Sequence, residues 1–426
     1  MARHCLSSGS DLHFARIRLT DPTITNATID GEVCVYGGFG YVAEAPGTSN
    51  WSKFANLSAD YVVSNESELL DALSSCDHND VIGIKGVIPL TNSFKFDKLG
   101  ICFVGVTPNA ALIRPKDASI IDFEEHKKPI TGLILSNLTF RFYMGVYGNI
   151  NGNTFDCITQ DREFITNEWA GYKIYFADAY GKASFAATIS SNTANTITIN
   201  SWPSFDHVSV VPYYFIFPQT THPYIKGDCG IISGYPDDHR LRFDGVIRDC
   251  VFRINNGEAI VISPPNNQGS AAIFNNVFYD LYFPSAISGK FDYTVVSNNM
   301  FLGTATNDIS SFHPDSVIDF NGRFVHTNVV RGNIFANTGH VIVDAVIKYD
   351  DQIGTVSYIA VLSNEFKGFN LDSGYMIILD GGGSAHKCRV IANNFYHDNS
   401  NLTGFVRDHI GGTINGYIGN NYDAEA

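Results

Sequence analysis

The stretch VVSNNMF at residues 295–301 decides the fold, because a close copy, VVRGNIF, follows at residues 329–335. Each copy contains apolar residues, an Asn, one further residue and an aromatic, and SNLTF at 136–140 and NGNTF at 151–155 fit the same pattern. From residue 252 onward the aromatic anchors are Phe252, Phe278, Phe301, Phe335, Phe366, Phe395 and Tyr422. Successive anchors lie 26, 23, 34, 31, 29 and 27 residues apart. A period of this length is typical of a solenoid.

The residue types narrow the kind of solenoid. β-Branched residues followed by Asn are typical of a short strand that ends in a tight turn, because Asn tolerates left-handed backbone angles. In six of these seven coils an Asn stands two residues before the anchor, and the six are Asn276, Asn299, Asn333, Asn364, Asn393 and Asn420. Cys250 is the exception. Stacked parallel strands would place the amides in one ladder and the aromatics in another, and the periodicity of helical repeats is missing. The sequence therefore predicts an all-β parallel β-helix.

The repeats and the segment ahead of them resemble the right-handed parallel β-helix superfamily, which contains pectate-lyase-like polysaccharide enzymes and phage tailspikes. YVVSNESELLDALSSC, at residues 61–76, supplies a cap at Ser64 or Asn65 and an amphipathic helix, and two apolar strands follow. A helix of this kind covers the open end of the first coil. The resemblance covers roughly residues 61–155 and 240–426. It implies the fold, whereas the same solenoid hosts lyases, hydrolases, epimerases and non-catalytic binders.

The sequence predicts four regions. Residues 1–60 do not follow the repeat and are expected to be an irregular capping or attachment segment. Residues 61–155 hold the first β-helix coils, and residues 241–426 hold the main coils. Between them, residues 156–240 alternate as antiparallel hairpins do, which predicts an inserted small β-domain. Its W-x-G phrase followed by ISSNTANTIT resembles a module inserted in many phage and bacterial β-helix proteins.

The net charge of the chain limits the kinds of partner that it is expected to bind. The formal net charge of −15 disfavours a nucleic-acid partner, and an acidic polysaccharide would need a locally basic groove or a bridging cation. The amino-terminal MARHCLSSGSDLHFARIRL lacks the apolar core of a secretory signal, and no apolar run suggests a membrane partner. We therefore expect a virion or extracellular location without a cleaved signal peptide. The eight cysteines lack metal-site spacing and are predicted to be buried free thiols.

Known catalytic phrases are missing from the sequence. The chain lacks the R-x-P-x-x-R-x-G and W-x-DH phrases of pectate lyases, and the NTD, GHG and RIK phrases of polygalacturonases. GYPDDH at residues 234–239 faintly resembles the aspartate-rich motif of alginate epimerases, but the order of its residues differs. Family resemblance therefore assigns no reaction.

A candidate site emerges when the second strand of each coil is aligned. The alignment predicts one column of residues, namely Ser263, Ser288, Asp319, Lys348, Asp380 and Asp408. Asp319 and Asp380 would flank Lys348, roughly 10 Å from each other. Such carboxylates could hold a water for an inverting glycosidase. Alternatively, Lys348 could be the base of a lyase while Arg323 or a cation neutralises a uronate carboxylate. A solvated sheet face with modest ion pairs is the third alternative.

Further ligand-binding candidates lie at a junction and in a loop. The junction between the inserted domain and the main coils carries a charged cluster, made of Asp237, Asp238, His239 and Arg240. Such junctions often form clefts, although a solvated turn also explains the cluster. Asp350 is expected in a long loop, and loop insertions on repeat proteins tend to collect on the binding face. No cofactor is required by these patterns, and calcium is the cation they leave open.

Three functions fit these patterns. The first is a virion surface protein of the phage tail or tailspike type, which binds a host polysaccharide and in one version depolymerises it. The second is a stand-alone polysaccharide lyase or glycoside hydrolase, and the third is a purely structural virion component. A homo-oligomer and contacts with other virion proteins stay open. We expect the first function.

Overall fold

Strands make up most of the described chain. In the computed structural model of the 426-residue chain, the described residues are 2–5, 12–15, 17–18, 33–36, 39–43, 51–56, 59–94, 98–115, 119–122, 130–141, 144–177, 183–201, 213–217, 232–234, 243–253, 259–262, 269–279, 286–289, 293–303, 316–321, 324–337, 342–343, 345–351, 355–368, 370–371, 375–381, 386–396, 403–408, 415–419 and 422–423. These residues contain one α-helix. None of their helices is long and apolar enough to span a bilayer.

The chain divides into two compact units, residues 1–62 with 80–83 and residues 63–79 with 84–426. The first unit contains an antiparallel pair, β1 (Ala2–Cys5) and β2 (Leu12–Ala15). It also contains a four-stranded sheet of β3 (Ile17–Arg18), β4 (Val33–Tyr36), β5 (Phe39–Ala43) and β6 (Trp51–Asn56). Residues 1–60 were expected to lie outside the repeat, and these strands belong to none of the long sheets described next.

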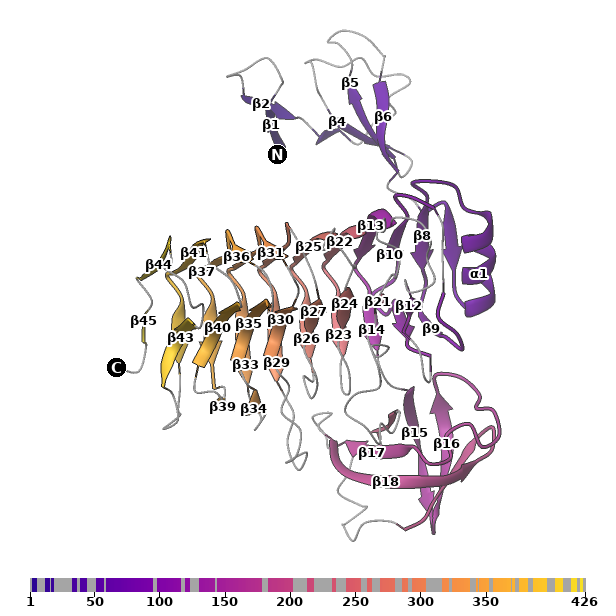
Figure 1. The fold of residues 1–426 in the computed structure, drawn as a ribbon. Helices are drawn as coiled ribbons and strands as arrows, with labels where there is room; N and C mark the ends of the chain where they lie inside the picture. The colour runs from indigo at the N-terminus through magenta and orange to yellow at the C-terminus, as the bar shows by residue number, and fades with distance from the viewer. Residues whose placement is uncertain are drawn as a thin grey trace. The chain divides into compact units, whose positions relative to one another are not determined.

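Three long parallel sheets contain most of the remaining strands (Figure 1). Sheet I consists of β7 (Tyr61–Val63), β8 (Val81–Ile84), β10 (Cys102–Gly105), β13 (Ile130–Ser136), β22 (Phe243–Arg248), β25 (Gly269–Phe274), β28 (Val295–Ser297), β31 (Phe324–His326), β32 (Val329–Arg331), β36 (Thr355–Ser357), β37 (Ala360–Leu362), β41 (His386–Ile391) and β44 (Asn415–Gly419). Sheet II consists of β9 (Val87–Pro89), β11 (Ala111–Ile113), β14 (Thr139–Arg141), β23 (Val251–Arg253), β26 (Val277–Tyr279), β29 (Met300–Gly303), β33 (Ile334–Asn337), β38 (Glu365–Lys367), β42 (Asn394–Tyr396) and β45 (Tyr422–Asp423). Sheet III consists of β12 (Ile121–Asp122), β21 (Ile232–Gly234), β24 (Ile260–Ile262), β27 (Ile287–Gly289), β30 (Ser316–Asn321), β35 (Ala345–Asp351), β40 (Tyr375–Gly381) and β43 (Gly404–Asp408).

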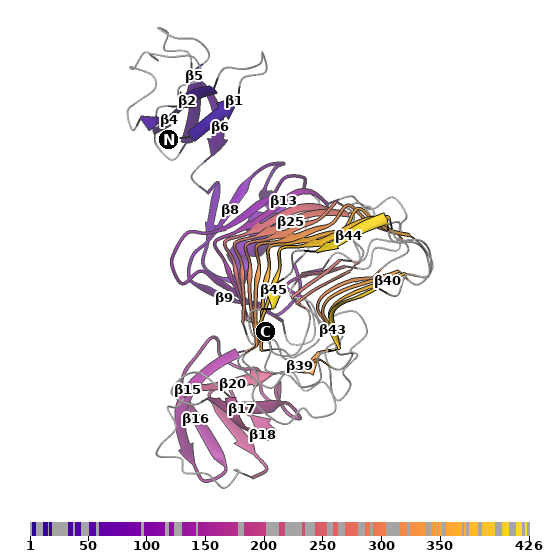
Figure 2. The ribbon, with the colours of Figure 1, turned by 90° about the vertical axis from the view of Figure 1, so that its left-hand side faces the viewer.

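Successive coils pair strand with strand in all three sheets, so the predicted parallel β-helix is confirmed. Figure 2 views the stack from its carboxyl-terminal end. The chain runs counterclockwise from sheet I through sheet II to sheet III while it advances toward the viewer, which is a right-handed coil. A small parallel pair, β34 (Ile342–Val343) with β39 (Asn370–Leu371), lies in the connections between sheets II and III.

The interior holds the predicted aromatic ladder. Sheet II places its aromatic anchors in one register, and the stacked residues are Phe140, Phe252, Phe278, Phe301, Phe335, Phe366 and Phe395. Neighbouring rings are 4.7 to 5.0 Å apart at their centroids and stack face to face. All seven side chains are fully buried. The ladder fills the core with large apolar surface from Phe140 to Phe395. Tyr422, which was also expected as an anchor, is one residue out of register, because it pairs with Asn394 while Asp423 pairs with Phe395.

The predicted Asn ladder is confirmed from Asn276 to Asn393, at the turn between sheets I and II, while Asn420 lies outside the described residues. The side chain of Asn333 donates to the Val296 carbonyl and to Asn364 Oδ1, both at 3.0 Å. Its Oδ1 accepts from the backbone N–H of Asn299 at 2.9 Å and from Nδ2 of Asn299 at 3.0 Å. The pattern repeats through the buried Asn276, Asn299, Asn333, Asn364 and Asn393. Cys250, the exception in the repeat, donates its N–H to Asn276 Oδ1 and ends the ladder.

The residue before each ladder position has a left-handed backbone. These residues are Asp249, Asn275, Asn298, Gly332, Ser363 and Ala392, with φ between 54° and 63°. We call this segment the Asn turn. Asn, Asp and Gly adopt the left-handed conformation most easily, which explains their use at four of the six positions.

The capping helix α1 (Glu66–Ser75) begins at Asn65, which settles the choice between Ser64 and Asn65. The Asn65 side chain accepts from Glu68 N at 2.9 Å, and the Ser64 N–H donates to the Glu68 carboxylate at 2.7 Å. This reciprocal pair satisfies backbone groups at the helix start. Leu69 and Leu73 are buried, and the Glu66 carboxylate accepts from Thr91 N in the first coil at 2.8 Å. The helix is therefore bound to the end of the solenoid.

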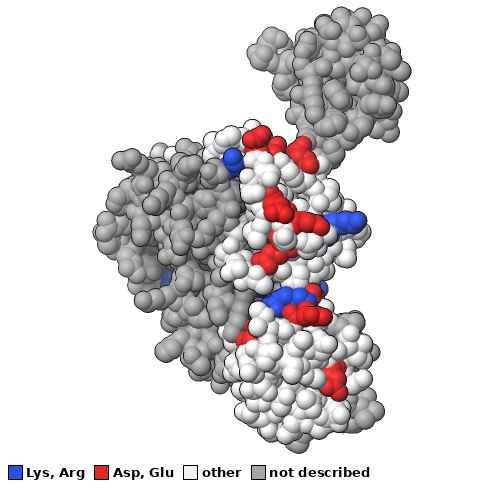
Figure 3. Space-filling model, turned by 90° about the vertical axis from the view of Figure 1, so that its right-hand side faces the viewer, with Lys and Arg blue, Asp and Glu red and all other residues white. Residues whose placement is uncertain are grey.

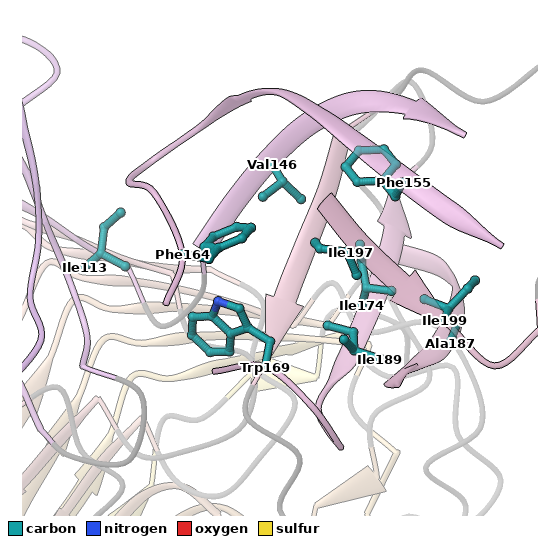
Figure 4. Packing of buried hydrophobic residues seen from close by; sticks show 10 residues of the cluster. All are labelled: Ile113, Val146, Phe155, Phe164, Trp169, Ile174, Ala187, Ile189, Ile197 and Ile199. Carbon is teal, nitrogen blue, oxygen red and sulfur yellow. The ribbon is translucent and has the colours of Figure 1, made fainter. Parts of the chain in front are cut away.

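The inserted β-domain is a closed antiparallel barrel. Its strands are β15 (Met144–Asn151), β16 (Thr154–Gln160), β17 (Lys173–Ala177), β18 (Ala183–Asn192), β19 (Thr196–Ile199) and β20 (Tyr213–Phe217). Figure 4 shows its core, in which Phe155, Trp169 and the isoleucines of facing strands pack together with Ile113 of β11. NGNTF at 151–155 connects β15 to β16 as a hairpin rather than forming a coil, so the barrel begins ahead of residue 156.

Seven cysteines fall among the described residues, and the five whose side chains are described are free thiols. Cys76, Cys250 and Cys388 are buried, while Cys102 and Cys157 are half-buried. Burial raises the pKa of Cys250 to about 12. A thiol with so high a pKa stays protonated at neutral pH and reacts slowly, in line with the structural role predicted for these residues.

Replacing Asn333 by Ala should lower the free energy of unfolding by about 3 kcal/mol, because it removes two donated and two accepted hydrogen bonds and leaves buried backbone groups without partners. Guanidinium unfolding followed by circular dichroism measures the change. Asn394→Ala, on the outer side of β42, should cost less than about 0.5 kcal/mol. Equal losses in the two variants would contradict a special role for the ladder.

Candidate functional site

The predicted polar column lies on sheet III and is correct in its centre only. Ser288, Asp319 and Lys348 are consecutive Cα partners in β27, β30 and β35. The next partners in the same column are Ile378 of β40 and Arg407 of β43, not the Asp380 and Asp408 expected from the alignment. At the other end Val261 pairs with Ser288, at the place where Ser263 was expected, and Ser263 itself lies outside the described residues.

The error of two residues at β40 has a physical reason. Met376, Ile377, Ile378 and Leu379 are all buried, so both faces of this strand are apolar and its sequence carries no alternation. Without alternation the apolar pattern does not fix the register of a strand. Ile347 pairs with Ile377, and Tyr349 pairs with Leu379. Tyr349 and Leu379 are each followed by an Asp. Aligning Tyr349 with Leu379 would have given the observed register.

The column is shielded from solvent. Ile318 and Phe320 are fully buried toward the core, so Asp319 lies on the outer face of the strand between them. Asp319 is nevertheless only 7% exposed, and Ser288 is 5% exposed. The solvated sheet face, which was the third alternative, therefore does not describe this column. A carboxylate with so little exposure needs charged or hydrogen-bonding partners, and the half-buried Lys348 occupies the adjacent strand position.

Asp350 and Asp380 form a second pair of positions beside the column. Asp350 was expected in a long loop, but it belongs to strand β35. It pairs with Asn321 of β30 on one side and with Asp380 of β40 on the other. These residues stand two positions beyond Asp319 and Lys348 along their strands, which places them on the same face of the sheet. Three carboxylate-bearing positions, one ammonium and one guanidinium position therefore share the outer face of sheet III.

Several candidates lie outside the described residues. They are Arg323, Asp237, Asp238, His239 and Arg240, and their roles remain predictions. Within the described ranges no three His, Cys, Asp or Glu side chains converge into a metal-binding group. Calcium, the cation that the sequence left open, remains a prediction.

Comparisons with known proteins give structures of low similarity. No protein-family model and no curated protein matches the chain. The tailspike protein gp49 from Pseudomonas phage LKA1 is 12% identical, with 84% of this chain and 74% of that chain covered and a TM-score of 0.24. The alginate lyase AlyF-OU02, in complex with G6, is 11% identical, with 86% and 85% covered and a TM-score of 0.32. The Family 28 exopolygalacturonase of Yersinia enterocolitica is 10% identical, with 88% and 82% covered and a TM-score of 0.27. The fold of this chain follows from its own strand pairing.

A double-mutant cycle tests whether Asp319 and Lys348 interact. Lys348→Met should lower the free energy of unfolding by about 2 kcal/mol, because it leaves a carboxylate of low exposure without its neighbouring ammonium. Asp319→Asn in the same chain should recover part of that loss. Guanidinium unfolding of the wild type, both single variants and the double variant measures the coupling. Additive losses would show that the two groups do not interact.

Proposed function

We propose that this chain is a virion surface β-helix protein that binds a host polysaccharide through the outer face of sheet III. One observation supports the proposal most: the charged positions Asp319, Lys348, Asp350, Asp380 and Arg407 gather on one face of the stacked strands. Strands one coil apart lie about 4.8 Å from each other, so the face offers polar groups at regular intervals along the axis. A linear glycan presents its hydroxyl groups in the same repetitive way.

The chemistry of this face suits sugar hydroxyls. Carboxylates accept hydrogen bonds from hydroxyl groups, and a charged acceptor makes such bonds stronger than a neutral one does. The rigid strands hold these acceptors in place, which lowers the entropic cost of binding.

Hydrolysis is the first version of catalysis, with Asp350 and Asp380 as its carboxylates, since these positions are opposed on neighbouring strands, about 4.8 Å apart at Cα. Asp319 and Asp380, the inverting pair first expected, are two strands and two residues apart. Lyase chemistry with Lys348 as the base is the second version.

The virion assignment rests on the resemblance of the inserted W-x-G module to modules of phage β-helix proteins. It predicts that antibodies raised against the purified chain decorate phage particles in electron micrographs and block their adsorption to host cells. Absence of the chain from purified particles, as judged by mass spectrometry, would favour the stand-alone enzyme instead.

The polysaccharide proposal is tested by titration calorimetry and product analysis with a panel of neutral and acidic polysaccharides. Asp380→Asn should weaken binding of the recognised glycan about tenfold, because it removes a charged hydrogen-bond acceptor. New reducing ends with retained anomeric configuration would establish hydrolysis through Asp350 and Asp380. Unsaturated uronate absorbance would instead establish a lyase and direct mutation to Lys348.

Asp156→Asn is the matched control, since Asp156 is an exposed carboxylate of barrel strand β16. It should leave binding unchanged. Equal effects of Asp380→Asn and Asp156→Asn, or no binding of any polysaccharide by the wild type, would reject the proposal.

A further inference from the structure

Sheet I contains a row of strained residues that the proposed function does not use. Tyr293, Thr327 and Tyr358 have left-handed backbones, with φ of 53°, 54° and 58°. Each lies two residues before the first residue of β28, β32 or β37, in three successive coils. Those first residues, Val295, Val329 and Ala360, are strand partners in register. The row therefore crosses three neighbouring strands at one bend of the sheet.

The residue types in this row are unfavourable for their backbone. A side chain that is branched at Cβ or bulky is a genuine outlier at positive φ, whereas Asn, Asp and Gly are tolerated. The Asn turn uses those tolerated residues at four of its six left-handed positions. The bend in sheet I instead carries two tyrosines, and they are 66% and 51% exposed. Strain of this kind persists where the side chain serves a purpose, and exposed rings point to a binding role.

Basic side chains accompany the tyrosines. Arg331 of β32 and Arg389 of β41 are exposed on the outer face of sheet I. We call the combined area the bend surface, and it consists of Tyr293, Val295, Thr327, Val329, Arg331, Tyr358, Ala360 and Arg389. Its valines and alanine are half-buried and give it an apolar floor.

The charge of the bend surface is opposite to that of the whole chain. The sequence has 43 acidic against 28 basic residues, yet the segments 293–297, 327–331, 358–362 and 386–391 contain no Asp or Glu. Acidic side chains gather elsewhere, and Figure 3 shows several of them on the face that carries α1. The bend surface is therefore a locally basic area of the kind that an acidic chain needs to hold an acidic ligand.

We propose that the bend surface binds an anionic polysaccharide, as a second glycan surface separate from the outer face of sheet III. Tyr293 and Tyr358 are two coils apart, about 10 Å, which is close to the length of a disaccharide unit. Tyrosine rings offer amphipathic faces and edges to sugar rings, and arginine pairs with carboxylate or sulfate groups in bidentate geometry. The inference rests on the proposed function only in taking a glycan as the ligand.

Other partners fit this surface less well. In a symmetric dimer built on this patch, Arg331 and Arg389 of two copies would face one another with no carboxylate in the patch to pair with them. A nucleic acid would extend past the two arginines, and there the net charge of −15 of the chain would repel it. An anionic glycan is narrow enough to contact the arginines and the tyrosines without covering the acidic surroundings.

The first test separates side-chain function from backbone strain. Tyr293→Asn with Tyr358→Asn should weaken binding of alginate oligosaccharides about tenfold in titration calorimetry. The same variant should keep or raise the melting temperature, because Asn suits a left-handed backbone. Ser363→Asn with Ala392→Asn is the matched control, since both are exposed left-handed positions of the Asn turn. The control should bind as the wild type does.

The second test addresses charge. Arg331→Gln with Arg389→Gln should weaken binding of alginate oligosaccharides and flatten its dependence on salt, while Lys367→Gln, an exposed cation on sheet II, should change neither. Asp156→Asn, at an exposed position of barrel strand β16, should leave this salt-dependent binding intact.

Three outcomes would overturn the proposal. The first is a wild type that binds none of alginate, polygalacturonate and hyaluronan at low salt. The second is unchanged binding by the tyrosine variant together with a lower melting temperature, which would make the tyrosines structural. The third is a wild-type oligomer, seen by light scattering, that the tyrosine variant dissociates without any change in glycan binding, because the surface would then join copies of this chain.

Discussion

The buried Asn side chain at the turn between sheets I and II is the interaction on which the solenoid depends. Each ladder Asn binds the coil before it and the coil after it, so the amides fix the spacing and the register of neighbouring coils at one point. The Asn-to-aromatic interval therefore stays constant although coil length varies between 23 and 34 residues. Extra residues go into the connections on either side of sheet III. Strands of only three residues suffice in sheets I and II because the ladder and the stacked rings set their positions.

The parts of the fold that the sequence predicts are those with a residue-specific requirement. An Asn that must accept two hydrogen bonds and a Phe that must stack on its neighbours leave a periodic trace, and the ladders were predicted correctly from Asn276 to Asn393 and from Phe252 to Phe395. Sheet III has no such residue. Its β40 is apolar on both faces, so sequence alignment placed Asp380 beside Lys348, whereas the structure places it beside Asp350. The candidate site was therefore predicted in its location and in the Asp319–Lys348 contact position, but not in the arrangement of its carboxylates.

The phrase NGNTF shows that a segment can match the repeat motif without forming a coil of the solenoid. It fits the repeat, but it lacks the apolar residues ahead of the Asn that a coil of sheet I requires. In the structure its Asn151 and Thr154 are partners across the hairpin of β15 and β16, and Phe155 fills the barrel core. A short motif therefore identifies a coil only where the strand before it is apolar enough to line the solenoid interior. Charged and exposed positions obey no comparable rule, which is why the bend surface leaves no periodic signal.

The two proposed surfaces follow from the same geometric property of the solenoid, namely its regular repeat along the axis. A parallel stack repeats each outward position about every 4.8 Å, so substitutions in successive coils create rows of chosen chemistry without disturbing the core. On sheet III the rows carry mainly carboxylates, and on sheet I they carry arginines and tyrosines. At Tyr293 the left-handed bend is held in place because the side chain of Asn328, buried in the same bend, accepts from Thr294 N at 3.0 Å. That hydrogen bond stabilises a backbone that the tyrosine itself disfavours, so the side chain facing solvent can differ from those that a turn alone would select.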